Sequence, residues 1–287
     1  MDIALIELVK VVILGIVEGL TEWLPVSSTG HMILVDEFIR LDVSTAFMDM
    51  FLVVIQLGAI FAVCFRFFHE LWPFARAQHS GKLAVRPAKI NLWLKIIIAC
   101  LPAAVLGILF DDFLDAHLNN APVIAIVLIL YGVLFIWIER RNAKAEFPIR
   151  SVDQIELSTA LLIGLFQCLA LIPGTSRSGV TILGAMLIGV SRVCAAEFSF
   201  FLSVPIMFGA SAVKLIKYFV KGGSFTGSQS FYLILAMLVA FVVSLYCINF
   251  LLEFIRKHSF AVFGWYRILL GILVLLGTVF TFLARIL

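Results

Sequence analysis

The chain has 287 residues, of which 63% are hydrophobic and 14% charged, with a net charge of +3 and a mean hydropathy of +1.13. Soluble domains are typically about one quarter charged and about half apolar, so this composition excludes a water-soluble globular fold. The basic residues gather in loops and not along one face, which argues against nucleic-acid binding. The apolar composition predicts an all-α polytopic membrane protein.

The first apolar segment, Ile3–Leu24, carries acidic residues that a lipid-facing helix would not tolerate. Glu18 and Glu22 are four residues apart, so both carboxylates lie on one face of a helix. Pro25 ends that helix because it has no N–H group and clashes with the preceding turn. The polar turn that follows, residues 26–31, suits a helix N-terminus whose free N–H groups point at an anion. Since lipid makes such a polar cluster costly, the sequence predicts a functional site here.

The path through the membrane combines two re-entrant hairpins with six spans. Residues 3–24 and 31–39 are expected to enter the membrane and turn back, and residues 158–172 and 182–190 to do the same around a second polar turn. Three further apolar segments follow each hairpin and are long enough to span a bilayer. These predicted spans are Ala46–Phe68, Leu92–Phe110, Val123–Ile138, Ala195–Leu215, Phe231–Leu252 and Val262–Leu283.

Charged loops predict the orientation of the chain. The loops at residues 69–95 and 139–157 are basic and are expected to be cytoplasmic. The acidic loop after residue 110 then faces outward, and both termini are external. Three lysines fall on the outer side against this rule: Lys214, Lys217 and Lys221.

Weak internal similarities in matching order predict a duplication. They pair Pro25-Val26-Ser27-Ser28 with Pro173-Gly174-Thr175-Ser176 at an offset of 148 residues, Gly58-Ala59 with Gly209-Ala210 at 151, and the residues around Gly132 with those around Gly271 at 139. Each half has one hairpin and three spans, and since three is odd, the second half must be inverted. We expect a single membrane domain over residues 1–287, with inverted repeats of approximately 1–140 and 155–287 joined by a basic cytoplasmic loop.

Arg177 is the central residue of the second polar turn. An arginine at membrane depth requires a counter-charge or an anionic ligand, and its planar fork suits phosphate. Hydroxyls and amides of the same turn can complete a phosphate cradle. The residues expected to bind substrate there are Gly174, Ser176, Ser178 and Thr181. The alternative is a buried ion pair with Glu18 or Glu22 that holds the halves together, and the two interpretations are compatible.

If the two hairpin tips meet, their side chains form an acid/base, nucleophile and electrophile set suited to phosphoryl chemistry. The expected catalytic residues are Glu18, Glu22, Ser28, His31 and Arg177. Ser28 is the predicted nucleophile and His31 its proton acceptor, because positions i and i+3 share a helix face. Ser27 is an alternative nucleophile. In the competing mechanism a glutamate activates water and Ser28 only binds phosphate oxygen.

Other polar residues have more than one interpretation. Ser27, Thr29 and Gln56 are expected to contact substrate, although Gln56 sits inside a span and hydrogen bonding between helices explains it equally well. Glu18 and Glu22 could hold Mg²⁺ or Ca²⁺, which prefer oxygen ligands, or act as base and orienter without any metal. Arg267 is expected to be a structural partner or an interfacial anchor.

Several long motifs resemble one known family. EGLTE, PVSSTGH, PGTSRSGVT, FLVVIQLGA, FQCLALIPG and AAEFSFFLSVPIM are similar to those of the undecaprenyl-diphosphate phosphatases, also called bacitracin-resistance proteins. The resemblance implies a bacterial inner-membrane hydrolase that converts undecaprenyl diphosphate to undecaprenyl phosphate and inorganic phosphate. It thereby recycles the lipid carrier of peptidoglycan synthesis. The implied fold has two interdigitated inverted repeats, and the implied site opens to the periplasm.

The family's functional residues carry over without departure. The glutamate motif is filled by Glu18 and Glu22, the first turn by Ser28 and His31, and the second turn by Ser176, Arg177 and Thr181. Lipid phosphatases of the acid-phosphatase type are excluded, because they require a histidine several residues after the Ser-Arg pair and none follows here up to Cys194. The remaining alternative is a transporter or flippase of the polyprenyl phosphate carrier. The sequence leaves the oligomeric state open, a homodimer included.

The orientation generates a first testable prediction. A cysteine placed at Ser80, in the basic loop, is expected to resist membrane-impermeant thiol reagents in intact cells because this loop is cytoplasmic. Ready labelling at this position would contradict the predicted topology.

Overall fold

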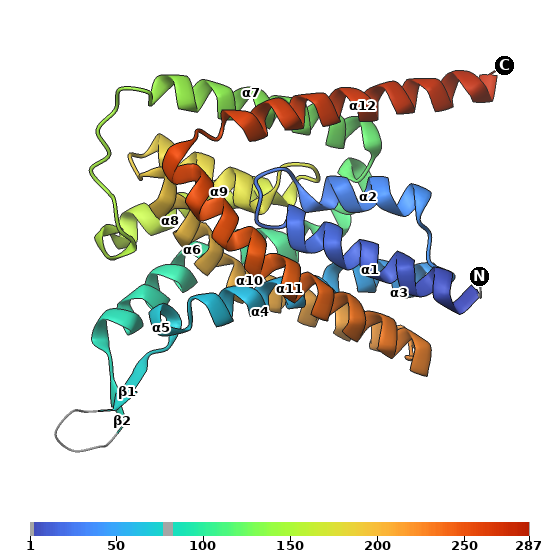
Figure 1. Cartoon of the computed structure of the whole chain (residues 1–287), viewed down its shortest axis with the longest axis horizontal. Coiled ribbons are helices and arrows are strands. Elements are labelled where there is room, and N and C mark those ends of the chain that lie inside the picture. Colours follow the sequence, from blue (N-terminus) through green and yellow to red (C-terminus); the bar gives the residue numbers. More distant parts are fainter. Residues whose placement is uncertain (1–2, 77–82, 287) are drawn as a thin grey trace.

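The computed structural model describes residues 3–76 and 83–286, and these are almost entirely helical (Figure 1). The elements in chain order are α1 (Ile3–Thr21), α2 (Ser28–Phe38), α3 (Thr45–Val54), α4 (Gln56–Arg66), α5 (Phe68–Leu71), β1 (Phe74–Arg76), β2 (Leu83–Val85), α6 (Pro87–Leu118), α7 (Ala121–Arg141), η1 (Val152–Gln154), α8 (Leu157–Gln167), η2 (Cys168–Leu171), α9 (Arg177–Leu187), α10 (Arg192–Val220), α11 (Gly227–Lys257) and α12 (Ala261–Ile286).

Six helical segments within the described ranges are long and apolar enough to cross a membrane, which confirms the all-α polytopic class. They are Thr45–Arg66, Pro87–Phe110, Ala121–Arg141, Arg192–Val220, Gly227–Lys257 and Ala261–Thr278. Each overlaps one predicted span. The first is interrupted at Ile55, between α3 and α4. The helices of the two polar-turn hairpins, α1–α2 and α8–α9, pack against these spans, and α2, α8 and α9 are shorter than any of them.

The predicted loop boundaries are wrong at both ends of α6. Residues 69–95 do not form one loop: β1 and β2 pair as a short antiparallel hairpin, and α6 begins at Pro87. Lys95 is buried within α6, where its ammonium donates to the Asp153 carbonyl at 3.1 Å. The acidic stretch after residue 110 is also helical, since α6 continues to Leu118. A helix of 32 residues is about 48 Å long and exceeds the roughly 30 Å hydrocarbon core, so its charged ends need not be loops.

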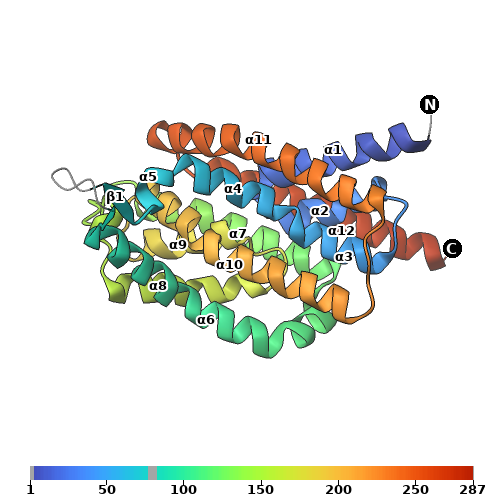
Figure 2. The ribbon, with the colours of Figure 1, turned by 90° about the horizontal axis from the view of Figure 1, so that it is seen from below.

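Helix pairs from the two halves pack through backbone contacts at glycine. Helices α7 and α12 lie side by side (Figure 1), while α1 packs on α11 and α6 on α8 (Figure 2). A Cβ atom at Gly132 of α7 would lie 2.6 Å from the Gly264 carbonyl of α12. Lipid gives little hydrophobic drive between helices, so this close approach supplies the van der Waals contact that holds them together.

The buried core lies beneath the first polar turn. Trp23 is fully buried and meets Phe200 of α10 edge-on, with ring centroids 5.2 Å apart. Phe67 extends the cluster, with its ring centroid 6.3 Å from that of Phe200. These large side chains form a rigid base under the turn that carries the polar residues.

The glycine contacts generate a prediction with a matched control. Gly164→Ala is expected to lower the thermal unfolding midpoint in detergent, because its Cβ would lie 2.2 Å from the Ala99 carbonyl and α6 would have to move away from α8. Overpacking of this kind costs about 1–3 kcal/mol. The control is Gly209→Ala in α10, whose Cβ meets nothing within 4 Å and which should be neutral or stabilising. Equal midpoints for the two variants would contradict this packing.

Candidate active site

The first polar turn places two carboxylates in the interior. The Glu22 N–H donates to the Glu18 carbonyl at 3.0 Å, so Glu22 continues the last turn of α1 and its carboxylate follows that of Glu18 on one side. Glu18 is only 3% exposed and Glu22 only 8%. Ser27 then caps α2, with its Oγ accepting the Gly30 N–H at 3.3 Å. The predicted polar turn at a helix N-terminus is confirmed.

The second polar turn repeats this cap. Ser176 Oγ accepts the Gly179 N–H at 3.2 Å, and Arg177 is the first residue of α9. Ser27 and Ser176 have φ angles of 78° and 71°, and no other non-glycine residue described in the structure has a positive φ. Such backbone costs of order 1–3 kcal/mol and gathers at functional sites.

The matching caps correct the predicted alignment of the two turns by one residue. Ser27 corresponds to Ser176 at an offset of 149, whereas the alignment on proline paired Ser28 with Ser176 at 148. The second turn has one more residue between its proline and its cap. Ser28 therefore stands at the position of Arg177, and the two turns contribute different chemistry at equivalent places.

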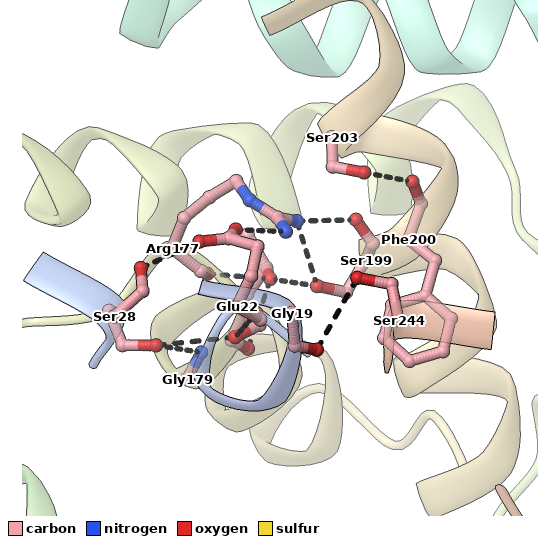
Figure 3. Close-up of polar contacts among 12 residues, drawn as sticks. Gly19, Glu22, Ser28, Arg177, Gly179, Ser199, Phe200, Ser203 and Ser244 are labelled. Carbon is pink, nitrogen blue, oxygen red and sulfur yellow. Dashed lines mark hydrogen bonds and ion pairs between the residues drawn. The ribbon is translucent and has the colours of Figure 1, made fainter. Parts of the chain in front are cut away.

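The carboxylate of Glu22 joins the two turns (Figure 3). Its Oε2 accepts the Ser28 hydroxyl at 2.6 Å, and its Oε1 accepts an N–H of Arg177 at 3.0 Å. The Ser178 hydroxyl adds a third link, at 3.2 Å to the Glu22 carbonyl. Glu22, Ser28 and Arg177 thus converge as expected, and the ion pair considered as the alternative for Arg177 is present.

The guanidinium of Arg177 is held on its other side by α10. Its second terminal nitrogen donates to the Ser199 carbonyl at 2.7 Å (Figure 3). The guanidinium also lies over the Trp23 ring, 5.9 Å from its centroid. Thr181 is fully buried and lies 2.6 Å from the Ser199 hydroxyl, where it supports Ser199. The side chain of Thr29 lies outside the described residues.

His31 does not pair with Ser28, so this part of the sequence prediction is wrong. Its Nδ1 is 2.7 Å from the Ser27 carbonyl and its Nε2 is 2.7 Å from the Tyr266 hydroxyl, with the two rings parallel. Helical side chains tilt toward the N-terminus, so His31 covers the preceding turn while Ser28 points back toward Glu22.

Gln56 also lies apart from this cluster. Its amide donates to the Ser211 hydroxyl of α10 at 3.3 Å, and Ser211 is about three helical turns beyond Ser199. Hydrogen bonding between helices, the alternative interpretation, is what the structure contains.

Arg267 is a structural partner, as one of its two sequence interpretations expects, but its position between the two polar turns is visible only in the structure. It is 0% exposed, and its terminal nitrogens donate to the Pro25 carbonyl at 3.3 Å, the Gly174 carbonyl at 2.8 Å and the Thr175 carbonyl at 3.0 Å. It therefore ties both polar turns together through their backbones. Gly174 supports this arrangement with a φ of 89° and close contact to Ile124. The sequence feature that indicates such a role is an arginine inside an apolar span, because a charge at that depth needs partners such as backbone carbonyls.

The donor set does not fit a resident metal ion. Among the described residues, no three His, Cys, Asp or Glu side chains are gathered as a ligand group. Both Glu22 oxygens already accept hydrogen bonds, from Ser28 and Arg177. Of the two predicted ligands for Mg²⁺ or Ca²⁺, this leaves Glu18 as a single further carboxylate.

Comparison with known proteins places the chain among bacterial membrane proteins. The family model described as "Bacitracin resistance protein BacA" matches residues 11–273. An undecaprenyl-diphosphatase of Enterococcus faecalis is 58% identical over 97% of this chain and 99% of its own. Undecaprenyl-diphosphatases of Streptococcus thermophilus (94% of this chain, 93% of its own) and Desulfitobacterium hafniense (95% and 96%) are 54% and 53% identical.

The bonds of Arg267 generate a stability prediction. Arg267→Lys keeps a positive charge but cannot reach three carbonyls on two turns with a planar fork, so the unfolding midpoint should fall. Each lost bond from a charged donor is worth about 1.5–3 kcal/mol. The control is Arg256→Lys, at an exposed position of α11, which should leave the midpoint unchanged. If both variants melt like the parent chain, Arg267 does not hold the turns together.

Proposed function

This chain belongs to the BacA family of bacitracin resistance proteins and is an undecaprenyl-diphosphatase, and we propose that the Glu22–Ser28–Arg177 cluster is its active site. The reaction converts undecaprenyl diphosphate to undecaprenyl phosphate and inorganic phosphate. The names of the relatives favour this hydrolysis over transport of the carrier. A bacterial multi-pass protein of this family fits the inner membrane, where its lipid substrate lies.

The observation that carries the proposal is the hydrogen bond from Ser28 to Glu22. A serine hydroxyl is a poor nucleophile until a base accepts its proton, and a base must lie within about 2.6–3.2 Å. The 2.6 Å contact meets this requirement. Ser27 is less suited to attack, because it is almost fully buried and its Oγ already caps α2. The contact therefore favours Ser28 as nucleophile and Glu22, rather than His31, as its base.

The reaction then runs in two displacements. Ser28 Oγ attacks the terminal phosphorus while its proton passes to Glu22. The bond from this phosphorus to the bridging oxygen breaks, and undecaprenyl phosphate leaves. Water next attacks the phosphoserine, a proton returns to Ser28 Oγ, and inorganic phosphate is released. Glu22 gives its first proton to the oxygen of the departing undecaprenyl phosphate. It then takes a proton from the attacking water and returns it to Ser28 Oγ as the phosphorus–Oγ bond breaks.

Arg177 supplies the positive charge, and its pairing with Glu22 makes that charge available only when Glu22 is protonated. Protonation of Glu22 removes the negative charge from the 3.0 Å ion pair. The guanidinium can then favour the charge that develops on the phosphoryl oxygens, where a preorganised donor contributes most. Ser199 holds the guanidinium in position during this change.

The competing mechanism is direct attack by water activated by Glu18 or Glu22, with Ser28 binding a phosphate oxygen. It uses the same cluster and the same substrate. The two differ in the number of displacements at phosphorus, which makes them separable by stereochemistry.

We also propose that residues 1–140 and 155–287 are inverted repeats within one membrane domain. Two sets of contacts support this. Gly15 of α1 and Gly164 of α8 are 149 residues apart, the same offset that relates the two caps. Each makes a close helix contact, Gly15 with α11 and Gly164 with α6. The offset of 139 that relates Gly132 to Gly271 also relates their contact partners, Gly264 and Ala125, in exchanged roles. With the basic loops in the cytoplasm, the first hairpin would enter from the periplasm, and the site would open on that side.

Arg177 variants test the electrostatic role. Arg177→Ala should lower kcat by about 10²-fold or more, because one preorganised donor is worth roughly 3–4 kcal/mol at the transition state. Arg177→Lys should not restore the rate, since a single ammonium cannot bond Glu22 and Ser199 as a fork. Phosphate release from purified protein in detergent measures both rates. Each rate is divided by the folded fraction of that variant, because loss of Arg177 leaves the buried Glu22 carboxylate unpaired and lowers stability. Near-normal turnover of the alanine variant would remove Arg177 from the site.

Stereochemistry at the terminal phosphorus tests Ser28. A substrate made chiral there by isotopic and sulfur labelling should yield phosphate with retained configuration, because two inversions cancel. Net inversion would show a single displacement by water and would assign Ser28 to binding alone. The diphosphatase assignment would survive that result.

A further inference from the structure

A second polar cavity lies between the end of α10 and the start of α3, away from the active site. Its volume is about 340 Å³. The lining residues are Ser44, Ala46, Asp49, Met50, Lys214, Lys217, Tyr218, Lys221, Gly222 and Gly223. Lys214 is 15 residues beyond Ser199 on the same helix, which is about 22 Å along its axis. The cavity is therefore separate from the Glu22–Arg177 cluster.

The charges around this cavity favour an anion. Lys214, Lys217 and Lys221 are spaced i, i+3 and i+7, so they lie on one side of α10. Asp49 is the acidic residue among the lining side chains. The N-terminus of α3, at Thr45, adds the partial positive charge of a helix start. The lining residues thus supply three ammonium groups, which are donors that suit an anion, and one carboxylate.

The surroundings of the cavity place it at a membrane surface. Ile216, Phe219 and Val220, on the rest of the same helical end, are exposed apolar residues, and Val220 is 81% exposed. A helix end with apolar residues on one side and lysines on another suits the boundary between hydrocarbon and headgroups. If the basic loops are cytoplasmic, these lysines lie on the periplasmic side. The positive-inside rule, which places Lys and Arg in cytoplasmic loops, does not explain them there.

We propose that this cavity binds the phosphate headgroup of an anionic membrane lipid. The cavity volume of about 340 Å³ lies within the range of small-ligand pockets, which begin at about 300 Å³, so the cavity has room for a headgroup larger than free phosphate. The buried side chains of Met50 and Tyr218 form the floor, and the Tyr218 hydroxyl donates to the Ser224 carbonyl at 2.9 Å, which holds the following loop. The lysines bind the phosphate oxygens, and the lipid tail lies along the exposed apolar side of α10.

The test titrates three probes against the full-length protein in neutral detergent and follows the unfolding midpoint. The probes are phosphatidylglycerol, phosphatidylcholine with the same acyl chains, and inorganic phosphate. The main variant is Lys217→Gln with Lys221→Gln. The matched control is Lys257→Gln, an exposed lysine at the end of α11. Phosphatidylglycerol should bind the parent and the control equally, and the double variant at least about tenfold more weakly, as expected for two surface lysines.

Two further variants keep the proposal falsifiable if the double variant does not fold. Lys221 and Asp49 are both exposed, so single substitutions there should be tolerated. Lys221→Gln should weaken phosphatidylglycerol binding about fivefold, while Asp49→Asn should strengthen it by removing the opposing charge. Binding that is the same in all variants, or equal for phosphatidylcholine, overturns the proposal. A lysine-dependent response to inorganic phosphate alone would overturn the assignment to a lipid.

Discussion

The ion pair between Glu22 and Arg177 is the interaction on which the site depends. A guanidinium within a membrane protein is unfavourable unless it is paired, and here its partner comes from the other polar turn. The pair therefore brings together segments 155 residues apart in the chain. It also fixes the second oxygen of Glu22 on Ser28, so one carboxylate both neutralises the arginine and accepts the hydroxyl.

Two strained caps and one buried arginine keep that pair in register. Ser27 and Ser176 hold each turn in a left-handed conformation that serine seldom adopts. Arg267 compensates by binding the carbonyls of both turns, and its own charge is spread over three oxygen acceptors and the Tyr131 ring. Outside the turns, glycine contacts between helices of opposite halves hold the scaffold, because lipid supplies little hydrophobic drive for helix association.

Equivalent positions in the two turns have taken on different roles. Glu18 corresponds to Gln167, and Ser28 to Arg177, at the offset of 149 set by the caps. The first turn thus supplies acids and a hydroxyl, and the second supplies a cation. Gln167 is buried and its amide donates to the Ala99 carbonyl of α6, so it serves packing where Glu18 carries an acid. If the two turns are copies of one motif, as we propose, an active site between them requires this divergence, because two identical turns would bring like charges together.

The sequence by itself determined the fold class, the six spans, the two polar turns and the convergence of Glu22, Ser28 and Arg177, because burial in lipid makes every charge and every proline informative. It could not determine which hydroxyl contacts which base. That choice depends on the direction in which side chains point at the first residue of a helix. The predicted partner of Ser28 was His31, whereas its partner in the structure is Glu22. Nor could spacing alone show that Arg267, 90 residues beyond Arg177, reaches both turns, or that Gln56 bonds a neighbouring helix. Such contacts arise only when distant helices pack, because no local pattern records which faces will meet.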